Sequence, residues 1–199
     1  MRICFIGDSF VNGTGDDDCL GWVGRVCAQA RRGGLDVTAY NLGVRRDTST
    51  DIAARWRTEA SARLPVEHDG RLVFSFGAND CTADVSGGTR VDIERSVALA
   101  TTILGEAAAW RPTLMIGPPP VADPERNARL RRYAERMEAV CRAVDAPFLS
   151  PFEALHASGV WVREAQAGDG AHPNRGGYAI LAQLVSEWPA WRAWLAASG

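Results

Sequence analysis

Short apolar runs alternate along the chain with longer segments in which apolar residues recur at helical spacing. The apolar runs lie at residues 3–6, 36–42, 72–76, 113–117 and 147–149. The helical segments lie at residues 20–32, 49–63, 91–110, 124–144 and 176–187. Strands that alternate with helices predict a parallel sheet covered on both faces. Thr48 or Ser49 can cap the second helix, and Asn174 can cap the last.

This alternation predicts an α/β fold, a three-layer α/β/α sandwich around a five-stranded parallel, doubly wound sheet. Right-handed crossovers make the flavodoxin-like strand order 2-1-3-4-5 the natural expectation. The 199 residues contain no repeat, linker or low-complexity tract, so we expect a single domain over residues 1–199. Parallel sheets bind ligands beyond the carboxyl ends of their strands, and candidate functional residues should therefore follow the strands.

Composition and charge exclude several classes of function. A formal net charge of -2 gives no long-range attraction for polyanions, and we expect no nucleic-acid partner. All 22 basic residues are Arg, so the chain has no Lys for a phosphate-binding GxxxxGK[ST] loop. No stretch approaches the ~20 apolar residues of a transmembrane helix, and we expect a cytoplasmic protein. The five Cys show no CxxC spacing, so we expect no disulfide framework, metal or cofactor.

Four short segments with polar side chains follow predicted strands or precede the last predicted helix. They read Gly7-Asp8-Ser9-Phe10, Asn41-Leu42-Gly43-Val44-Arg45-Arg46-Asp47, Gly77-Ala78-Asn79-Asp80 and Gly168-Asp169-Gly170-Ala171-His172. Each segment alone is an ordinary turn, cap or surface loop. The first segment is not the GxSxG elbow of α/β-hydrolases, because position 11 is Val.

Taken together and in this order, the four segments resemble the four sequence blocks of the GDSL-type, or SGNH, serine hydrolases. The resemblance extends from Gly7 to the helix that follows His172. It implies that Ser9 attacks an ester carbonyl and that His172 takes the Ser9 proton, while Asp169 orients the imidazole. The chemistry is sound without the family, because a hydroxyl is a poor nucleophile until a base of near-neutral pKa lies beside it.

The resemblance also implies an oxyanion hole. Its donors would be the backbone N–H groups of Ser9 and Gly43 and the side-chain amide of Asn79. A glycine at position 43 would leave room for the tetrahedral carbon. The chain departs from the family at Phe10, where the family name has Leu. It departs again at Val44-Arg45-Arg46-Asp47, where many relatives carry small residues, and this departure bears on the substrate.

The two arginines in this second segment are candidate substrate-binding residues. Arg45 and Arg46 follow Gly43 closely, so they should lie at the rim of the pocket and could bind an acidic or phosphate-bearing ester. The alternative is that they pair with Asp47 or Asp51 and hold the loop.

Other conspicuous residues favour structural explanations. We expect Asp8 and Asp80 to make turn-stabilising hydrogen bonds, Asp16-Asp17-Asp18 to be a solvated loop, and His68 and His156 to serve structure or surface. The arginines of the fourth helix should form a solvated, salt-bridged face; they are Arg126, Arg129, Arg131, Arg132 and Arg136. The apolar residues near the end are a candidate membrane-seeking or dimer interface, or simply pack on the domain; they are Trp188, Trp191, Trp194 and Leu195.

The sequence therefore predicts a serine esterase of the lipase/acylhydrolase type that acts on small carboxylic esters. A carbohydrate acetyl esterase fits the same catalytic residues and would differ only in its pocket, which we expect the loops at 82–90 and 118–124 to shape. A catalytically silent sugar- or lipid-binding domain would lack one of the catalytic residues, and none is missing. An FMN-binding flavodoxin is disfavoured because three Asp follow Asn12-Gly13-Thr14-Gly15 and would repel a phosphate.

Overall fold

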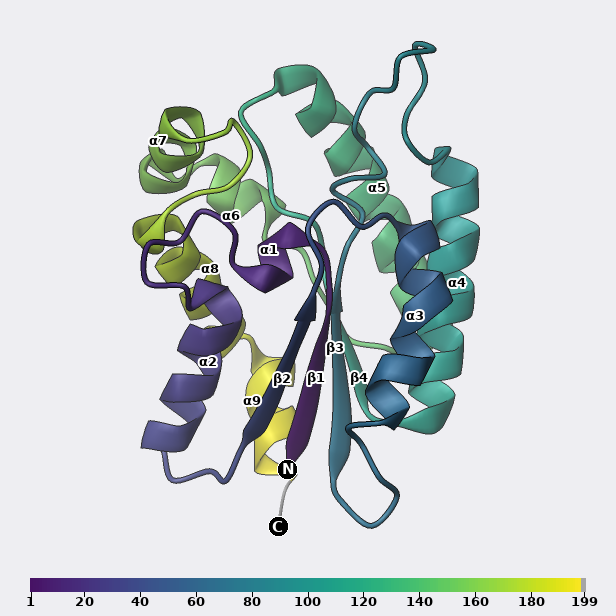
Figure 1. Cartoon of the computed structure of the whole chain (residues 1–199), viewed down its shortest axis with the longest axis vertical. Coiled ribbons are helices and arrows are strands. Elements are labelled where there is room, and N and C mark those ends of the chain that lie inside the picture. The colour runs from purple at the N-terminus through teal and green to yellow at the C-terminus, as the bar shows by residue number, and fades with distance from the viewer. Residues whose placement is uncertain (198–199) are drawn as a thin grey trace.

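Five parallel strands build the central sheet of the computed structural model, which describes residues 1–197 (Figure 1). They are β1 (Arg2–Gly7), β2 (Thr38–Gly43), β3 (Gly70–Ser75), β4 (Thr113–Ile116) and β5 (Phe148–Leu149). The strand order is β2-β1-β3-β4-β5, so the predicted order is confirmed. Strands β1 and β3 are buried almost throughout, as expected for parallel strands covered on both faces.

Helices cover both faces of the sheet. They are α1 (Ser9–Asn12), α2 (Gly21–Arg32), α3 (Ser49–Ser61), α4 (Ile93–Trp110), α5 (Pro124–Ala143), α6 (Phe152–His156), α7 (Gly159–Ala167), α8 (Arg175–Glu187) and α9 (Pro189–Ala196). Figure 1 shows α2 and α8 on one side of the sheet and α3 and α4 on the other, where α5 packs against α4. The three-layer α/β/α sandwich is confirmed.

The helices predicted from apolar periodicity are α2, α3, α4, α5 and α8, and each begins within two residues of its predicted start. The predicted caps are confirmed as well. Thr48 forms a capping box with Asp51 at the start of α3, and the Asn174 side chain accepts the N–H of Arg175 at 2.6 Å. Helices α1, α6, α7 and α9 are too short to display a 3.6-residue period, so apolar periodicity does not predict them.

The Trp-rich end of the chain packs on the sheet. Trp191 in α9 is buried, and its ring centroid lies 6.3 Å from that of Phe5 in β1. Trp188, Trp194 and Leu195 are half-buried against the same hydrophobic core. Packing within the fold, the second of the two expectations, therefore describes these residues.

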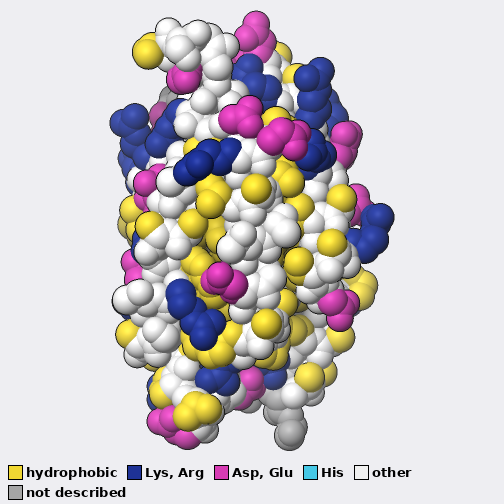
Figure 2. Space-filling model, turned by 90° about the vertical axis from the view of Figure 1, so that its right-hand side faces the viewer, with side chains coloured by type: hydrophobic (Ala, Val, Ile, Leu, Met, Phe, Trp, Pro, Cys, Tyr) yellow, Lys and Arg dark blue, Asp and Glu magenta, His cyan; other side chains and the backbone are white. Residues whose placement is uncertain are grey.

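The outer face of α3 and α4 carries mixed charge. Figure 2 shows basic and acidic side chains interspersed with small apolar patches on this face. One of the ion pairs in this region joins Arg136 in α5 to Glu94 in α4 at 2.7 Å. Such a face lacks the basic stripe of a polyanion-binding protein. Within residues 1–197, no helix combines the length and apolarity that crossing a bilayer requires.

Candidate active site

The tight end of strand β1 positions Ser9. A Cβ atom at Gly7 would lie 1.9 Å from the carbonyl oxygen of Ser75 in β3, so only glycine fits there. Asp8 then caps α1, because its Oδ1 accepts the N–H of Phe10 at 3.0 Å. The result places Ser9 at the first position of α1, beyond the carboxyl end of the central strand.

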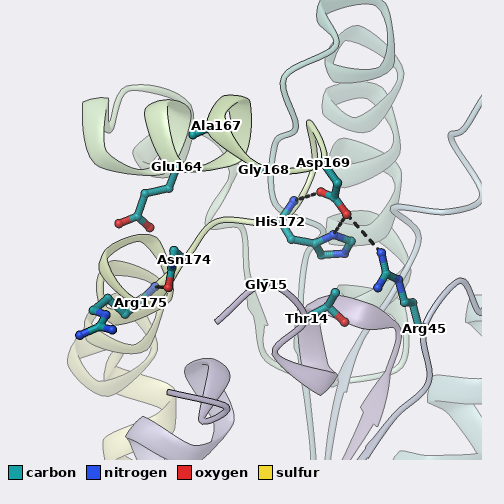
Figure 3. A pocket seen from close by; sticks show the side chains of 10 residues that line it. All are labelled: Thr14, Gly15, Arg45, Glu164, Ala167, Gly168, Asp169, His172, Asn174 and Arg175. Carbon is teal, nitrogen blue, oxygen red and sulfur yellow. Dashed lines mark hydrogen bonds and ion pairs between the residues drawn. The ribbon is translucent and has the colours of Figure 1, made fainter. Parts of the chain in front are cut away.

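Ser9, His172 and Asp169 form a continuous hydrogen-bonded line. The Ser9 hydroxyl lies 2.7 Å from His172 Nε2, and His172 Nδ1 lies 2.7 Å from Asp169 Oδ2. The second carboxylate oxygen, Asp169 Oδ1, accepts the backbone N–H groups of Ala171 and His172 at 3.0 Å each. Figure 3 shows Asp169 above the imidazole, so the loop before α8 carries both residues in the orientation that a base and its orienting acid require.

The protonation states of this line suit base catalysis. Burial lowers the pKa of His172, and this effect exceeds the opposing influence of Asp169. Burial disfavours ionised Asp169, but the hydrogen bonds from the backbone and imidazole of His172 outweigh it and lower the pKa of Asp169 to about 2. At neutral pH the imidazole is therefore uncharged and able to accept a proton, while the carboxylate is ionised.

Asn79 lies in the loop after β3, half-buried and tied to the neighbouring loop. Its Nδ2 donates to the carbonyl oxygen of Asp47 at 2.9 Å. The carbonyl oxygen of Ala78 accepts two hydrogen bonds from the guanidinium of Arg126 in α5, at 3.2 and 2.7 Å. These hydrogen bonds fix Ala78 and Asn79, so the side-chain amide of Asn79 is held at the carboxyl edge of the sheet.

Gly43 is required for a reason other than the predicted one. A Cβ atom there would lie 2.2 Å from the backbone nitrogen of Asn12 and 2.8 Å from the carbonyl oxygen of Asp8, so Gly43 makes room for α1 and not for a tetrahedral carbon. Its N–H group already donates to Asn41 Oδ1 at 3.0 Å. The structure therefore does not present Gly43 as a free oxyanion donor.

This packing makes a stability prediction. Gly43→Ala should lower the free energy of unfolding by about 3 kcal/mol, since the added methyl group meets backbone atoms that cannot rotate away. Gly105→Ala in α4 is the matched control, because its Cβ would meet only Val144 at 3.8 Å and alanine favours a helix over glycine. Urea denaturation of both variants tests the prediction, and equal stabilities would contradict it.

The two candidate substrate-binding arginines differ in their surroundings. Arg45 donates to Asp169 Oδ2 at 3.3 Å, so it contacts the proposed catalytic acid directly. The Arg46 side chain is exposed and makes no ion pair within residues 1–197; its backbone has φ 74. Neither arginine pairs with Asp47 or Asp51, so that alternative is wrong. Asp47 pairs with Arg55 at 2.7 Å, and Asp51 caps α3.

A cavity of about 560 Å³ opens beside Asp169 and His172. Its lining consists of Thr14, Gly15, Arg45, Glu164, Ala167, Gly168, Asp169, His172, Asn174 and Arg175 (Figure 3). No residue of the loops at 82–90 and 118–124 lines this cavity, so their role in shaping the substrate pocket stays a prediction. The loop at 82–90 borders a hollow beside α4 and α5, and the loop at 118–124 borders another beside α5 and α7.

Some residues that support the site have roles that the sequence did not predict. Asp80 is buried and accepts hydrogen bonds from Ser49 at the start of α3 and from Ser96 in α4, so it joins two helices in place of a local turn. Asp8 makes the expected local bond, and burial raises its pKa to about 7. Within residues 1–197, no group of three His, Cys, Asp or Glu side chains could hold a metal ion.

Other expectations are corrected in the same way. Asp16 is buried and pairs with Arg25 at the start of α2, so it is not part of a solvated loop. On α5, Arg131 pairs with Glu153 as expected, but Arg126 and Arg129 bind backbone carbonyls of the loop after β3. His68 and His156 are exposed, as expected. A periodic helix pattern contains no signal for such long-range polar contacts.

Comparisons with known proteins agree with this architecture. A sequence model of the GDSL-like lipase/acylhydrolase family matches residues 5–180. None of the curated proteins matches the sequence significantly. The structure of Axe2, an acetylxylan esterase from Geobacillus stearothermophilus, has 21% identity and a TM-score of 0.76, covering 92% of this chain and 91% of that one. A lipase/acylhydrolase from Enterococcus faecalis has 24% identity and a TM-score of 0.73, covering 93% of each chain.

Proposed function

The chain belongs to the GDSL-like lipase/acylhydrolase family, and on this premise we propose that it is a serine esterase with Ser9 as nucleophile. His172 is the general base, and Asp169 orients it. The observation that carries this assignment is the unbroken line of two 2.7 Å contacts from Ser9 through His172 to Asp169. In addition, catalytic mutants of Axe2 replace one serine, one aspartate and one histidine by alanine.

The reaction proceeds in two halves. His172 Nε2 takes the Ser9 proton as Oγ attacks the ester carbonyl carbon, whose oxygen becomes an oxyanion. The tetrahedral intermediate then breaks the bond to the leaving oxygen, which receives the proton from His172 and departs as the alcohol. Water attacks the acyl-Ser9 with His172 again as base, and the second intermediate releases the carboxylic acid and restores the Ser9 hydroxyl.

The oxyanion requires donors that are free when the substrate arrives. The N–H of Ser9 has no acceptor within residues 1–197, and the Asn79 amide has a second hydrogen beyond the one bound to Asp47. Gly43 could contribute only by releasing Asn41. The N–H of Arg46 also has no acceptor in the same part of the chain. Arg46 precedes Asp47, whose carbonyl oxygen binds the Asn79 amide, so we propose the Arg46 N–H as the third donor in place of Gly43.

A carbohydrate acetyl esterase is the second candidate function. The cavity beside His172 supports it, because charged and polar side chains such as Arg45, Glu164 and Asn174 make up much of the lining. Sugar hydroxyls find hydrogen-bond partners in such a lining, whereas a long acyl chain would prefer apolar walls. The likeness to the acetylxylan esterase Axe2 points in the same direction.

A series of chromogenic 4-nitrophenyl esters from acetate to decanoate, assayed beside acetylated sugars, tests the proposal. We expect hydrolysis of the short esters, with His172 in its uncharged form, and activity should fall as acid protonates the imidazole. A carbohydrate esterase should show a higher kcat/KM for the acetylated sugars than for 4-nitrophenyl acetate. If the folded protein hydrolysed neither class, the esterase assignment would be wrong.

We also propose a cytoplasmic location. All five cysteines are unpaired thiols, which persist in a reducing compartment. Four of them are buried, and burial raises the pKa of Cys4, Cys27, Cys81 and Cys141 to about 12. These four thiols are therefore unreactive at neutral pH and serve as packing groups.

A further inference from the structure

One carboxylate oxygen of the catalytic acid has two charged or polar partners. Asp169 Oδ2 contacts His172 Nδ1 at 2.7 Å and the guanidinium of Arg45 at 3.3 Å. Figure 3 shows the two side chains reaching this oxygen from below, the imidazole from its own loop and Arg45 from the loop after β2. Because Oδ1 is occupied by two backbone N–H groups, Arg45 and His172 share the same oxygen.

The turn that carries Arg45 is anchored at both ends. The N–H of Val44 donates to the carbonyl oxygen of Gly7 at 3.0 Å. On the other side, the Asp47 carbonyl accepts from Asn79, and the Asp47 carboxylate pairs with Arg55. The Arg45 side chain therefore starts from a fixed position, although 60% of it is exposed. An ion pair with so much exposure contributes little to folding, and its main effect falls on the neighbouring imidazole.

Several elements bring charged groups toward His172, and Glu164 in α7 and Arg175 in α8 line the same cavity. The loop that carries His172 supplies Asp169, which favours the protonated imidazole, while Arg45 and the first turn of α5, through Arg126, disfavour it. On the α1 side, Asp8 is buried and Asp16 is already paired with Arg25. Arg45 disfavours the protonated imidazole in two ways. Its positive charge opposes proton binding directly, and its contact with Asp169 weakens the stabilisation that this carboxylate gives to the imidazolium.

We propose that Arg45 is a positioning residue that shares Asp169 with His172 and thereby keeps the imidazole uncharged and active at lower pH. The proposal rests on the serine esterase function proposed above. It assigns Arg45 a role within the catalytic line, in contrast to binding of an acidic substrate, which the sequence had suggested. The positive charge near the imidazole opposes proton binding, and removal of that charge should make His172 bind its proton more tightly.

The test compares Arg45→Gln, Arg45→Lys and wild type over pH 5–9. With a neutral ester, the ratio of Arg45→Gln to wild-type kcat/KM should fall about two- to fivefold between high and low pH, since the exposed charge exerts a modest effect. The decline should shrink in high salt, where exposed charges are screened. Arg45→Lys should keep the ratio flat. Arg142→Gln is the matched control, because it removes an equally long, exposed ion pair, at 3.3 Å, on α5.

Proton binding is also measured without substrate. The chain has three histidines, so NMR titration can follow His172 once the His68 and His156 signals are assigned through His68→Gln and His156→Gln. In Arg45→Gln, the His172 midpoint should move to higher pH. An unmoved midpoint, or a rise in KM confined to anionic esters, would overturn the proposal. A moved midpoint in a protein that hydrolyses no ester would contradict the esterase function and leave the sharing of Asp169 established.

Discussion

Ser9→Ala should lower kcat for ester hydrolysis by about 10⁵- to 10⁶-fold, which is the largest effect that the structure leads us to expect. Without Oγ, the imidazole of His172 has no nucleophile to activate, although the oxyanion donors and the cavity remain. The residual rate should reflect only binding and the remaining donors acting on water. Steady-state hydrolysis of 4-nitrophenyl acetate by purified wild type and variant measures the loss.

Two controls separate a chemical effect from a folding defect. Ser86→Ala makes the same substitution in an exposed loop, where the hydroxyl donates to Asp84, so it should retain wild-type activity. The Tm of Ser9→Ala should stay within a few degrees of wild type, because its hydroxyl fills little of the core. A fluorophosphonate should modify the peptide containing Ser9 in wild type alone. Retention of more than a few per cent of activity in Ser9→Ala would reject Ser9 as nucleophile.

The proposed roles of Ser9, Asp169 and His172 came from the resemblance of four ordered segments to the GDSL-type hydrolases, and the structure shows the local reasons why these three residues meet. Ser9 comes directly after the central strand, and the Asp-x-x-His spacing lets Asp169 bind both the backbone and the ring of His172. Ser9 lies at the carboxyl edge of the sheet because it follows β1, whereas Asp169 and His172 reach the same edge on the loop between α7 and α8. The alternation of apolar runs and helical segments therefore predicts the fold, whereas the proposed catalytic residues needed the resemblance to a known family.

The remainder of the site depends on contacts between segments that no local pattern encodes. Gly43 was expected to face the substrate, but α1 approaches it so closely that only glycine fits. Arg126 belongs to a helix whose charge pattern predicts a solvated face, yet its position in the first turn brings it to the carbonyl of Ala78. For Arg45 the sequence offers an acidic substrate or the nearby Asp47 or Asp51 as partners, whereas its partner in the structure is Asp169, which is far from it in the sequence.

Contacts between distant segments should matter most for the oxyanion hole, because such a contact holds Asn79. Asn79→Ala should lower kcat by about 10²–10³-fold, equivalent to roughly 3–4 kcal/mol of transition-state stabilisation, while KM changes little. The reason is that the amide binds charge that develops only after Ser9 attacks. Steady-state kinetics with 4-nitrophenyl acetate separate kcat from KM and give the loss directly.

Asn79→Ala also removes the hydrogen bond to Asp47, so loosening of the loop has to be distinguished from loss of a donor. Arg55→Gln makes that distinction, because it frees the same loop from its ion pair with Asp47 and from Gly7 without removing an oxyanion donor. If the donor is what counts, Arg55→Gln should retain most of kcat and Asn79→Ala should not. Equal losses in the two variants, or a change in Asn79→Ala mainly in KM, would assign Asn79 to loop support or substrate binding and leave the oxyanion to the backbone N–H groups of Ser9 and Arg46.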